Sequence, residues 1–99
     1  MKNDTQTLFQ IHDLRFRIWK NTRDPELEKQ CHRILHKMLE ILPPSHPHVQ
    51  SVILKNCIIL SYRKDFTPIE NLLTLFQSSL ERKESTFVPL YNRLKMMLG

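Results

Sequence analysis

Glycine is almost absent from this chain of 99 residues, because Gly99 at the very end is the only one. Phosphate-binding loops, nucleophile elbows and dinucleotide fingerprints need interior glycines, where the backbone approaches a ligand closely or turns sharply. Tight β-hairpin turns also favour glycine. The lack of glycine therefore excludes these motifs and argues against a hairpin-rich β fold.

Cysteines and long apolar runs are also scarce. Cys31 and Cys57 have no paired spacing and lie among apolar residues. We expect reduced thiols in the core of an intracellular protein, cytoplasmic or nuclear, rather than a disulfide framework. The longest uncharged apolar runs, residues 52–54 and 57–60, are far too short to span a bilayer, and the polar N-terminus does not resemble a secretory signal. No membrane association is expected.

Basic residues outnumber acidic residues by 15 to 10, which gives a formal charge of +5. Net charge bears on solubility and association more than on function. The basic residues are spread along the chain, without a run of five and without the alternation of basic and aromatic residues that is typical of nucleic-acid readers. The charge indicates either a solvated basic surface or an acidic partner, which is protein or nucleic acid.

Prolines and capping residues divide the chain into five segments with helical spacing of apolar residues. The clearest helix starts at Asp24-Pro25, an N-cap followed by proline at the first helical position. Residues 51–62 are β-branched and compatible with a strand, but helix is favoured because the segment exceeds the usual strand length. We predict an all-α fold of about five helices, stacked as antiparallel helix hairpins in a repeat array or a compact bundle.

The apolar pattern repeats at an offset of 42 residues. Apolar positions fall on apolar positions, as in the pairs Ile11/Ile53, Phe16/Ile58, Leu27/Ile69 and Met38/Leu80. A fixed period of this size is typical of helical repeats, whose units bury their apolar faces by stacking. We predict one helical domain over residues 1–99, with a unit at 7–45, a second unit at 46–86 and a terminal helix at 87–98.

Residues 46–82 resemble a tetratricopeptide unit of the long, kinesin-light-chain type. The matching features, in order, are His46-Pro47-His48-Val49, Asn56-Cys57, Tyr62, the turn at 63–66 and Ser79-Leu80-Glu81. The chain departs from that pattern in the turn, where Lys64 or Asp65 replaces a glycine, and in the second helix, where Ile69 or Leu72 replaces a small alanine. The resemblance implies stacked helix hairpins and a groove lined by the first helix of each unit.

A second resemblance rests on residues 90–98 together with Ile11-His12. These residues are similar to the integrase-binding bundle of chromatin-tethering growth-factor-like proteins. This resemblance also implies an all-α module that binds protein.

No arrangement of residues predicts catalysis or a metal site. His32 and His36 lie on one helix face near Cys31, but a metal site needs three converging ligands, and no glutamate lies between the histidines in a catalytic arrangement. Two solvated histidines explain the pair. Cys57 lies in the most apolar segment, where a thiol is normally unreactive. We therefore expect no enzyme activity, no cofactor and no metal ion.

The groove implied by the tetratricopeptide resemblance would be basic. Four basic residues fall on its first helices, namely Arg15, Arg17, Lys55 and Arg93. Asn56 is either a polar group on the groove floor that binds a peptide backbone or a polar gap on an exposed strip. We predict that the groove docks an acidic or amphipathic peptide of a protein partner, and that charge reversal at Arg15 and Lys55 abolishes capture.

Two and a half units are few for a free-standing array, so its ends are expected to expose apolar side chains, Trp19 among them. A homo-oligomer or a larger complex would cover this surface. The alternative function is a small basic helical bundle that binds nucleic acid or regulates a nucleoprotein complex, with an affinity that falls steeply with salt.

Overall fold

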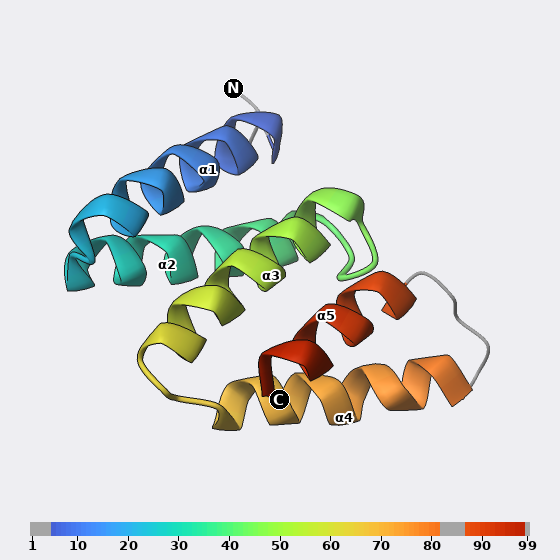
Figure 1. The fold of residues 1–99 in the computed structure, drawn as a ribbon. Coiled ribbons are helices and arrows are strands. Elements are labelled where there is room, and N and C mark those ends of the chain that lie inside the picture. Colours follow the sequence, from blue (N-terminus) through green and yellow to red (C-terminus); the bar gives the residue numbers. More distant parts are fainter. Residues whose placement is uncertain (1–4, 82–86, 99) are drawn as a thin grey trace. The chain divides into compact units, whose positions relative to one another are not determined.

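The structure, a computed structural model, describes residues 5–81 and 87–98. Its five helices (Figure 1) are α1 (Thr5–Thr22), α2 (Pro25–Ile41), α3 (Pro47–Tyr62), α4 (Thr67–Glu81) and α5 (Val88–Leu98). Within the described residues there is no strand. The all-α prediction is therefore confirmed, including the helical assignment of residues 51–62.

Local capping determines where α2 and α3 begin. Asp24 has an extended backbone, and its Oδ1 accepts a hydrogen bond from the Glu26 N–H at 2.9 Å, while Pro25 takes the first helical position. At the start of α3, Nδ1 of His46 accepts a hydrogen bond from the His48 N–H at 3.1 Å. These side chains pair N–H groups that the first turn of a helix leaves without a backbone partner.

Backbone contacts divide the chain into two compact units, Met1–Asn56 and Cys57–Gly99. The division falls inside the continuous helix α3, whereas the predicted boundary between repeat units lies before this helix, at residues 45 and 46. The arrangement of the chain as one domain of stacked repeat units stays a prediction.

The first unit is built around the antiparallel pair of α1 and α2, with the first residues of α3 (Figure 1). Trp19 of α1 has no exposed surface and stacks on Phe16, with ring centroids 5.7 Å apart. Its indole N–H donates a hydrogen bond to the Glu28 carboxylate of α2 at 2.9 Å. The other buried apolar residues of this unit are Cys31, Ile34, Met38, Val49, Val52 and Ile53.

The second unit contains the hairpin of α4 and α5. The rings of Phe76 and Phe87 stack with centroids 4.7 Å apart, and both side chains are buried. Ile69, Leu90 and Leu94 are also buried. The cap that the sequence predicts before the last helix, at residues 85 and 86, lies outside the described residues.

Over the described ranges, two non-glycine residues take a positive φ, Arg23 at 56° and Lys64 at 60°. Lys64 follows α3 in a Schellman arrangement, because its N–H bonds the Ser61 carbonyl at 3.0 Å and the Asp65 N–H bonds the Leu60 carbonyl at 2.9 Å. The position after such a helix end is usually glycine, since a Cβ is unfavourable in the left-handed region. The tetratricopeptide pattern has a glycine in this turn, and Lys64 is one of the two residues that the sequence places at that position.

Replacement of Lys64 by glycine is expected to raise the free energy of unfolding by about 0.5–1 kcal/mol, because relief of the Cβ clash exceeds the greater freedom of the unfolded chain. Urea denaturation followed by circular dichroism measures the change. Lys64→Ala keeps the Cβ while removing the same charge, and is expected to change the stability little. Equal effects of the two substitutions would contradict the prediction.

Candidate functional site

Two of the predicted partner-binding residues meet at one carboxylate that the sequence did not single out. The predicted residues are Arg15, Arg17, Trp19, Lys55, Asn56 and Arg93. Asp13 accepts from Nζ of Lys55 at 2.9 Å and from Nη2 of Arg17 at 2.8 Å. The hydrogen bond from Lys55 is the main reason that the pKa of the Asp13 carboxyl is lowered. The Lys55 side chain is only 19% exposed, whereas that of Arg17 is 69% exposed. Both cations therefore have an acidic partner within the first unit.

The contact between Asp13 and Lys55 joins residues 42 positions apart. A second contact with this separation joins Oε1 of Gln6 to Nε2 of His48 at 3.0 Å. In Figure 1, α1 and the start of α3 run in the same direction. The apolar pattern repeats every 42 residues, and these two pairs of contacting side chains of α1 and α3 are separated by the same number of residues.

Asn56 lies inside the first unit and is 3% exposed. Its Oδ1 lies 2.8 Å from Nε2 of His12, and its Nδ2 donates to the Cys31 carbonyl at 3.4 Å. This hydrogen bonding joins α1, α2 and α3, and it places Asn56 in the core, with neither of the surface roles that the sequence left open. His12 was not predicted, because a single histidine within an apolar pattern gives no signal of its own.

His12 has no exposed surface, and its Nδ1 has no hydrogen-bond partner in the described structure. Burial lowers the pKa of His12 and outweighs the opposite effect of its hydrogen bond with Asn56. The nearby charged or titratable groups are Lys55, Asp13 and His32. The imidazole is therefore held in its neutral form by its surroundings.

Trp19 and Arg93, the remaining predicted residues apart from Arg15, lie in different environments. Trp19 is in the core of the first unit, with the Arg23 guanidinium 4.4 Å from its ring centroid. Arg93 is exposed on α5 of the second unit. Within the first unit, the structure therefore does not gather the predicted residues on one surface.

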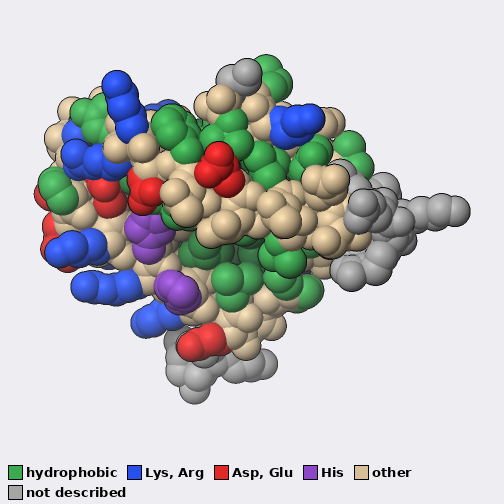
Figure 2. All heavy atoms as spheres, turned by 90° about the horizontal axis from the view of Figure 1, so that it is seen from below, with side chains coloured by type: hydrophobic (Ala, Val, Ile, Leu, Met, Phe, Trp, Pro, Cys, Tyr) green, Lys and Arg blue, Asp and Glu red, His purple; other side chains and the backbone are tan. Residues whose placement is uncertain are grey.

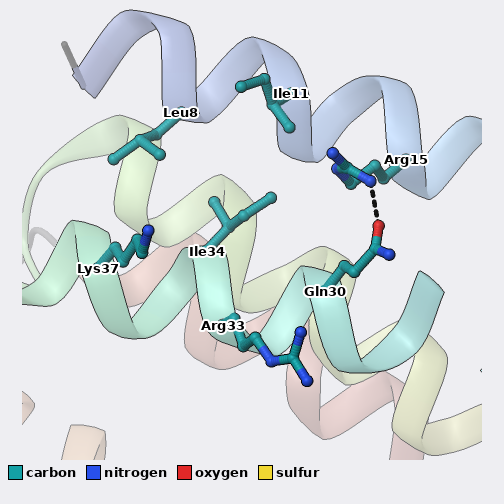
Figure 3. Close-up of a pocket in the computed structure, with 7 residues that line it drawn as sticks. All are labelled: Leu8, Ile11, Arg15, Gln30, Arg33, Ile34 and Lys37. Atoms are coloured by element: carbon teal, nitrogen blue, oxygen red, sulfur yellow. Dashed lines mark hydrogen bonds between the residues drawn. The ribbon is translucent and has the colours of Figure 1, made fainter. Parts of the chain in front are cut away.

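Arg15 lies in a pocket between α1 and α2 (Figure 3), which we call the α1–α2 pocket. Its volume is about 240 Å³, and it is lined by Leu8, Ile11, Arg15, Gln30, Arg33, Ile34 and Lys37. Positions 8, 11 and 15 of α1 follow steps of three and four residues, and each of positions 30, 33, 34 and 37 of α2 lies three or four residues from another. Each set therefore forms one helical face.

The α1–α2 pocket combines an apolar floor with a cationic rim. We use the term floor for Leu8, Ile11 and Ile34, and the term rim for Arg15, Arg33 and Lys37. Figure 3 shows Ile11 and Ile34 in the middle, with Leu8 and Lys37 toward one end. Arg15 lies at the other end, where it donates a hydrogen bond to Gln30. Among the described residues, no carboxylate forms an ion pair with a rim residue.

Arg33 and Lys37 were not predicted as binding residues. In the sequence they belong to the polar face of an amphipathic helix, together with Lys29 and His36, and a solvated face explains them. They become part of a pocket only because α1 packs beside that face. Nothing in the local sequence of α2 specifies this neighbour.

Groups with catalytic or metal-binding potential are few in this structure. Both cysteines are free and buried, and burial raises the pKa of Cys31 to about 11 and that of Cys57 to about 12, so both are protonated at neutral pH. Over residues 5–81 and 87–98, no three His, Cys, Asp or Glu side chains are grouped to hold a metal ion. None of the helices described is both long and apolar enough to cross a membrane.

In the first unit, uncompensated positive charge and open apolar surface thus coincide at the α1–α2 pocket. Comparisons of the chain with protein families, with curated proteins and with solved structures find no match.

Proposed function

We propose that the chain is a non-catalytic protein-interaction module that docks an acidic, amphipathic segment of a partner in the α1–α2 pocket. The observation that carries this proposal is the cationic rim around the apolar floor, without an acidic partner from the described chain. Apolar side chains of the segment bury against the floor, and its carboxylates form charge-assisted hydrogen bonds with the rim.

The size of the pocket favours a short peptide segment over a small-molecule ligand. Its volume of about 240 Å³ is below the usual range for small-molecule sites, and it is open along the two helices. Exposed ion pairs each contribute roughly 0.2–1 kcal/mol. We therefore expect these pairs to contribute modestly to the affinity, and we expect binding to weaken as salt is added.

The proposed site keeps the partner chemistry that the sequence predicts and changes the residues involved. Of the four basic residues assigned to a groove, Arg15 lines the α1–α2 pocket. We also propose that residues 7–45 and 46–86 are degenerate tetratricopeptide-like units. The 42-residue register between α1 and α3 and the left-handed position of Lys64 support this relationship.

A nucleic-acid partner has less support. Arg17 and Lys55 already pair with Asp13. Trp19 and Phe16 are buried, so their rings are not available to stack on bases. On the face shown in Figure 2, Lys and Arg side chains are interspersed with Asp and Glu side chains. Such a surface is less suited to following a phosphate backbone than a continuous basic stripe.

Association with a second copy or within a larger complex stays a prediction. Trp19, which the sequence places at an open end, is buried, and so is Phe16. The apolar side chains that α1 does expose are Leu14, at 58%, and Ile18, at 42%. Single exposed apolar residues are normal on protein surfaces, so this pair alone does not identify a subunit contact.

The proposal is tested by fluorescence anisotropy with a labelled peptide. Its apolar residues are three and four positions apart, and acidic residues lie between them. The Arg33→Glu/Lys37→Glu variant is expected to weaken binding at least tenfold, because it replaces attraction by repulsion. Lys29→Glu/Arg93→Glu is the matched control, since it changes the net charge equally at exposed positions outside the pocket. This control is expected to change the affinity less than threefold. A larger change would show that net charge alone explains the binding.

Two further results would contradict the proposal. One is the absence of peptide binding by the unmodified chain at low salt. The other is tighter binding of a single-stranded oligonucleotide than of the acidic peptide, with a steep loss on adding salt, which would support the nucleic-acid alternative. Circular dichroism of each variant checks that the helices remain intact.

A further inference from the structure

The site proposed above continues beyond the α1–α2 pocket. A second pocket of about 220 Å³ is lined by Leu8, Lys37, Glu40 and Ile41, and it shares Leu8 and Lys37 with the first. The two pockets adjoin at these residues, and we call their combined lining, which extends along α2 from Gln30 to Ile41, the groove. At about 1.5 Å per residue, this groove is about 16 Å long.

The walls of the groove suit a helix better than an extended peptide. Both walls are helix faces, whose side chains form ridges that fit between the side-chain ridges of another helix. The backbone groups of such walls are paired within their own helices, so an extended peptide would lose water from its N–H and C=O groups without gaining partners. A helix of about three turns spans the groove with its own backbone groups already paired.

Charge is distributed unevenly along the groove. Arg15 and Arg33 lie toward the Gln30 end, Lys37 lies between the ends, and Glu40 lies toward the Ile41 end. The C-terminal end of a helix has a partial negative charge, and its N-terminal end has a partial positive charge. A docked helix is therefore most stable with its C-terminal end near the two arginines and its N-terminal end near Glu40.

We infer that the partner segment is an amphipathic helix of about three turns that lies antiparallel to α2, with acidic residues in its C-terminal half opposite Arg15 and Arg33. This inference rests on the proposed function and adds the conformation, length and direction of the bound segment. Both the macrodipole and the side-chain charges favour the same direction.

The docked helix would not disturb the packing of α3. The groove uses positions 8, 11 and 15 of α1, whereas the contacts with α3 come from Gln6, Phe9, His12 and Asp13. At about 100° per residue, the two sets lie on different sides of α1. The α1–α2 hairpin therefore holds α3 on one side and presents the groove on another.

The test uses two peptides of about 11 residues with the same composition and blocked ends, which have apolar residues at helical spacing. Peptide C has its glutamates in the C-terminal half, and peptide N has them in the N-terminal half. Peptide C is expected to bind at least fivefold more tightly and to gain helical circular dichroism on binding. Free peptide N is the better helix, because acidic residues favour a helix N-terminus, so this preference cannot come from helicity alone.

A nitroxide label at the C-terminus of peptide C determines the direction directly. It is expected to broaden the amide signals of residues 30–33 more than those of residues 38–41. Arg15→Gln is expected to remove most of the preference for peptide C, while Lys29→Gln, on the same unit but outside the groove, retains it.

Equal or tighter binding of peptide N, broadening at residues 38–41 instead, or binding without a gain of helix would each overturn the inference and leave the proposed function standing. Failure of both peptides to bind, together with failure of the alternating peptide used above, would overturn the proposed function itself. The two failures are therefore distinguishable.

Discussion

Replacement of Trp19 by alanine is expected to lower the free energy of unfolding by about 3–5 kcal/mol, the largest effect of any single substitution considered. Trp19 has no exposed surface, its ring stacks on Phe16, and its indole N–H bonds Glu28. Alanine leaves a cavity between α1 and α2 and a carboxylate without its donor. A domain of this size has roughly 5–15 kcal/mol of stability, so the substitution is expected to remove a large share of it.

Urea denaturation followed by far-ultraviolet circular dichroism measures this loss. Leu75→Ala is the control for removing a large apolar side chain, because Leu75 is 60% exposed on α4 and the change is expected to stay within about 0.5 kcal/mol. Trp19→Phe retains a ring but not the indole donor, so its loss of stability is expected to lie between those of Trp19→Ala and Leu75→Ala. A loss below about 1 kcal/mol in Trp19→Ala would show that Trp19 does not hold α1 and α2 together.

The second large effect is expected at the hydrogen bond between Asn56 and His12. Asn56→Val is expected to lower the free energy of unfolding by about 2–3 kcal/mol, because it leaves the buried Nε2 of His12 without a partner. The double variant His12→Leu/Asn56→Val removes both polar groups and is expected to be more stable than Asn56→Val by about 1 kcal/mol or more. A double variant as unstable as the sum of its two single variants would contradict a specific interaction.

The same pair predicts a dependence of stability on pH. The folded pKa of His12 is lowered below its ordinary value of 6.5, so the unfolded chain binds the proton more readily. The stability is therefore complete above this value and decreases as the pH falls below it. Urea midpoints between about pH 7.5 and pH 5 are expected to decrease less steeply in the double variant than in the unmodified chain. Equal slopes would contradict the role of His12.

Two other titratable groups lie near His12, and their effects on the pH dependence of stability can be distinguished from that of His12. Burial also lowers the pKa of His32, so part of the slope below its ordinary value of 6.5 is expected to remain in the double variant. Asp13 has a lowered pKa because of Lys55, so its contribution is present above its ordinary value of 3.8 and is lost as the pH falls through the folded pKa. The Asp13 effect therefore belongs to a more acidic range.

The sequence predicted the helices well because helix ends are decided by residues within one turn. Asp24 and Pro25 act on α2 directly, and their observed geometry follows the predicted one. The 42-residue spacing of the apolar pattern was also recognisable in the sequence. Only the structure relates this spacing to contacts such as that between Asp13 and Lys55. Caps, prolines and apolar spacing are local properties, so one sequence is enough to recognise them.

The candidate site was predicted less well, partly because the predicted groove combined residues that face different sides of one helix. Arg15 and Arg17 were assigned to one groove, yet residues two apart on a helix do not face each other. Arg15 hydrogen-bonds Gln30, and Arg17 pairs with Asp13, on different sides of α1. The different directions of Arg15 and Arg17 could therefore have been predicted from their positions in the sequence.

The sequence by itself determined the helical class, the ends of α2 and α3, the basic charge and the absence of interior glycine motifs. Only the tertiary structure decided which faces of those helices are covered: it buries Trp19 and Asn56 and leaves Arg33 and Lys37 beside a pocket. The physical reason is that capping and periodicity depend on neighbours in the chain, whereas burial depends on which helix lies alongside. Whether a helix face forms part of a site therefore depends on which helix packs beside it.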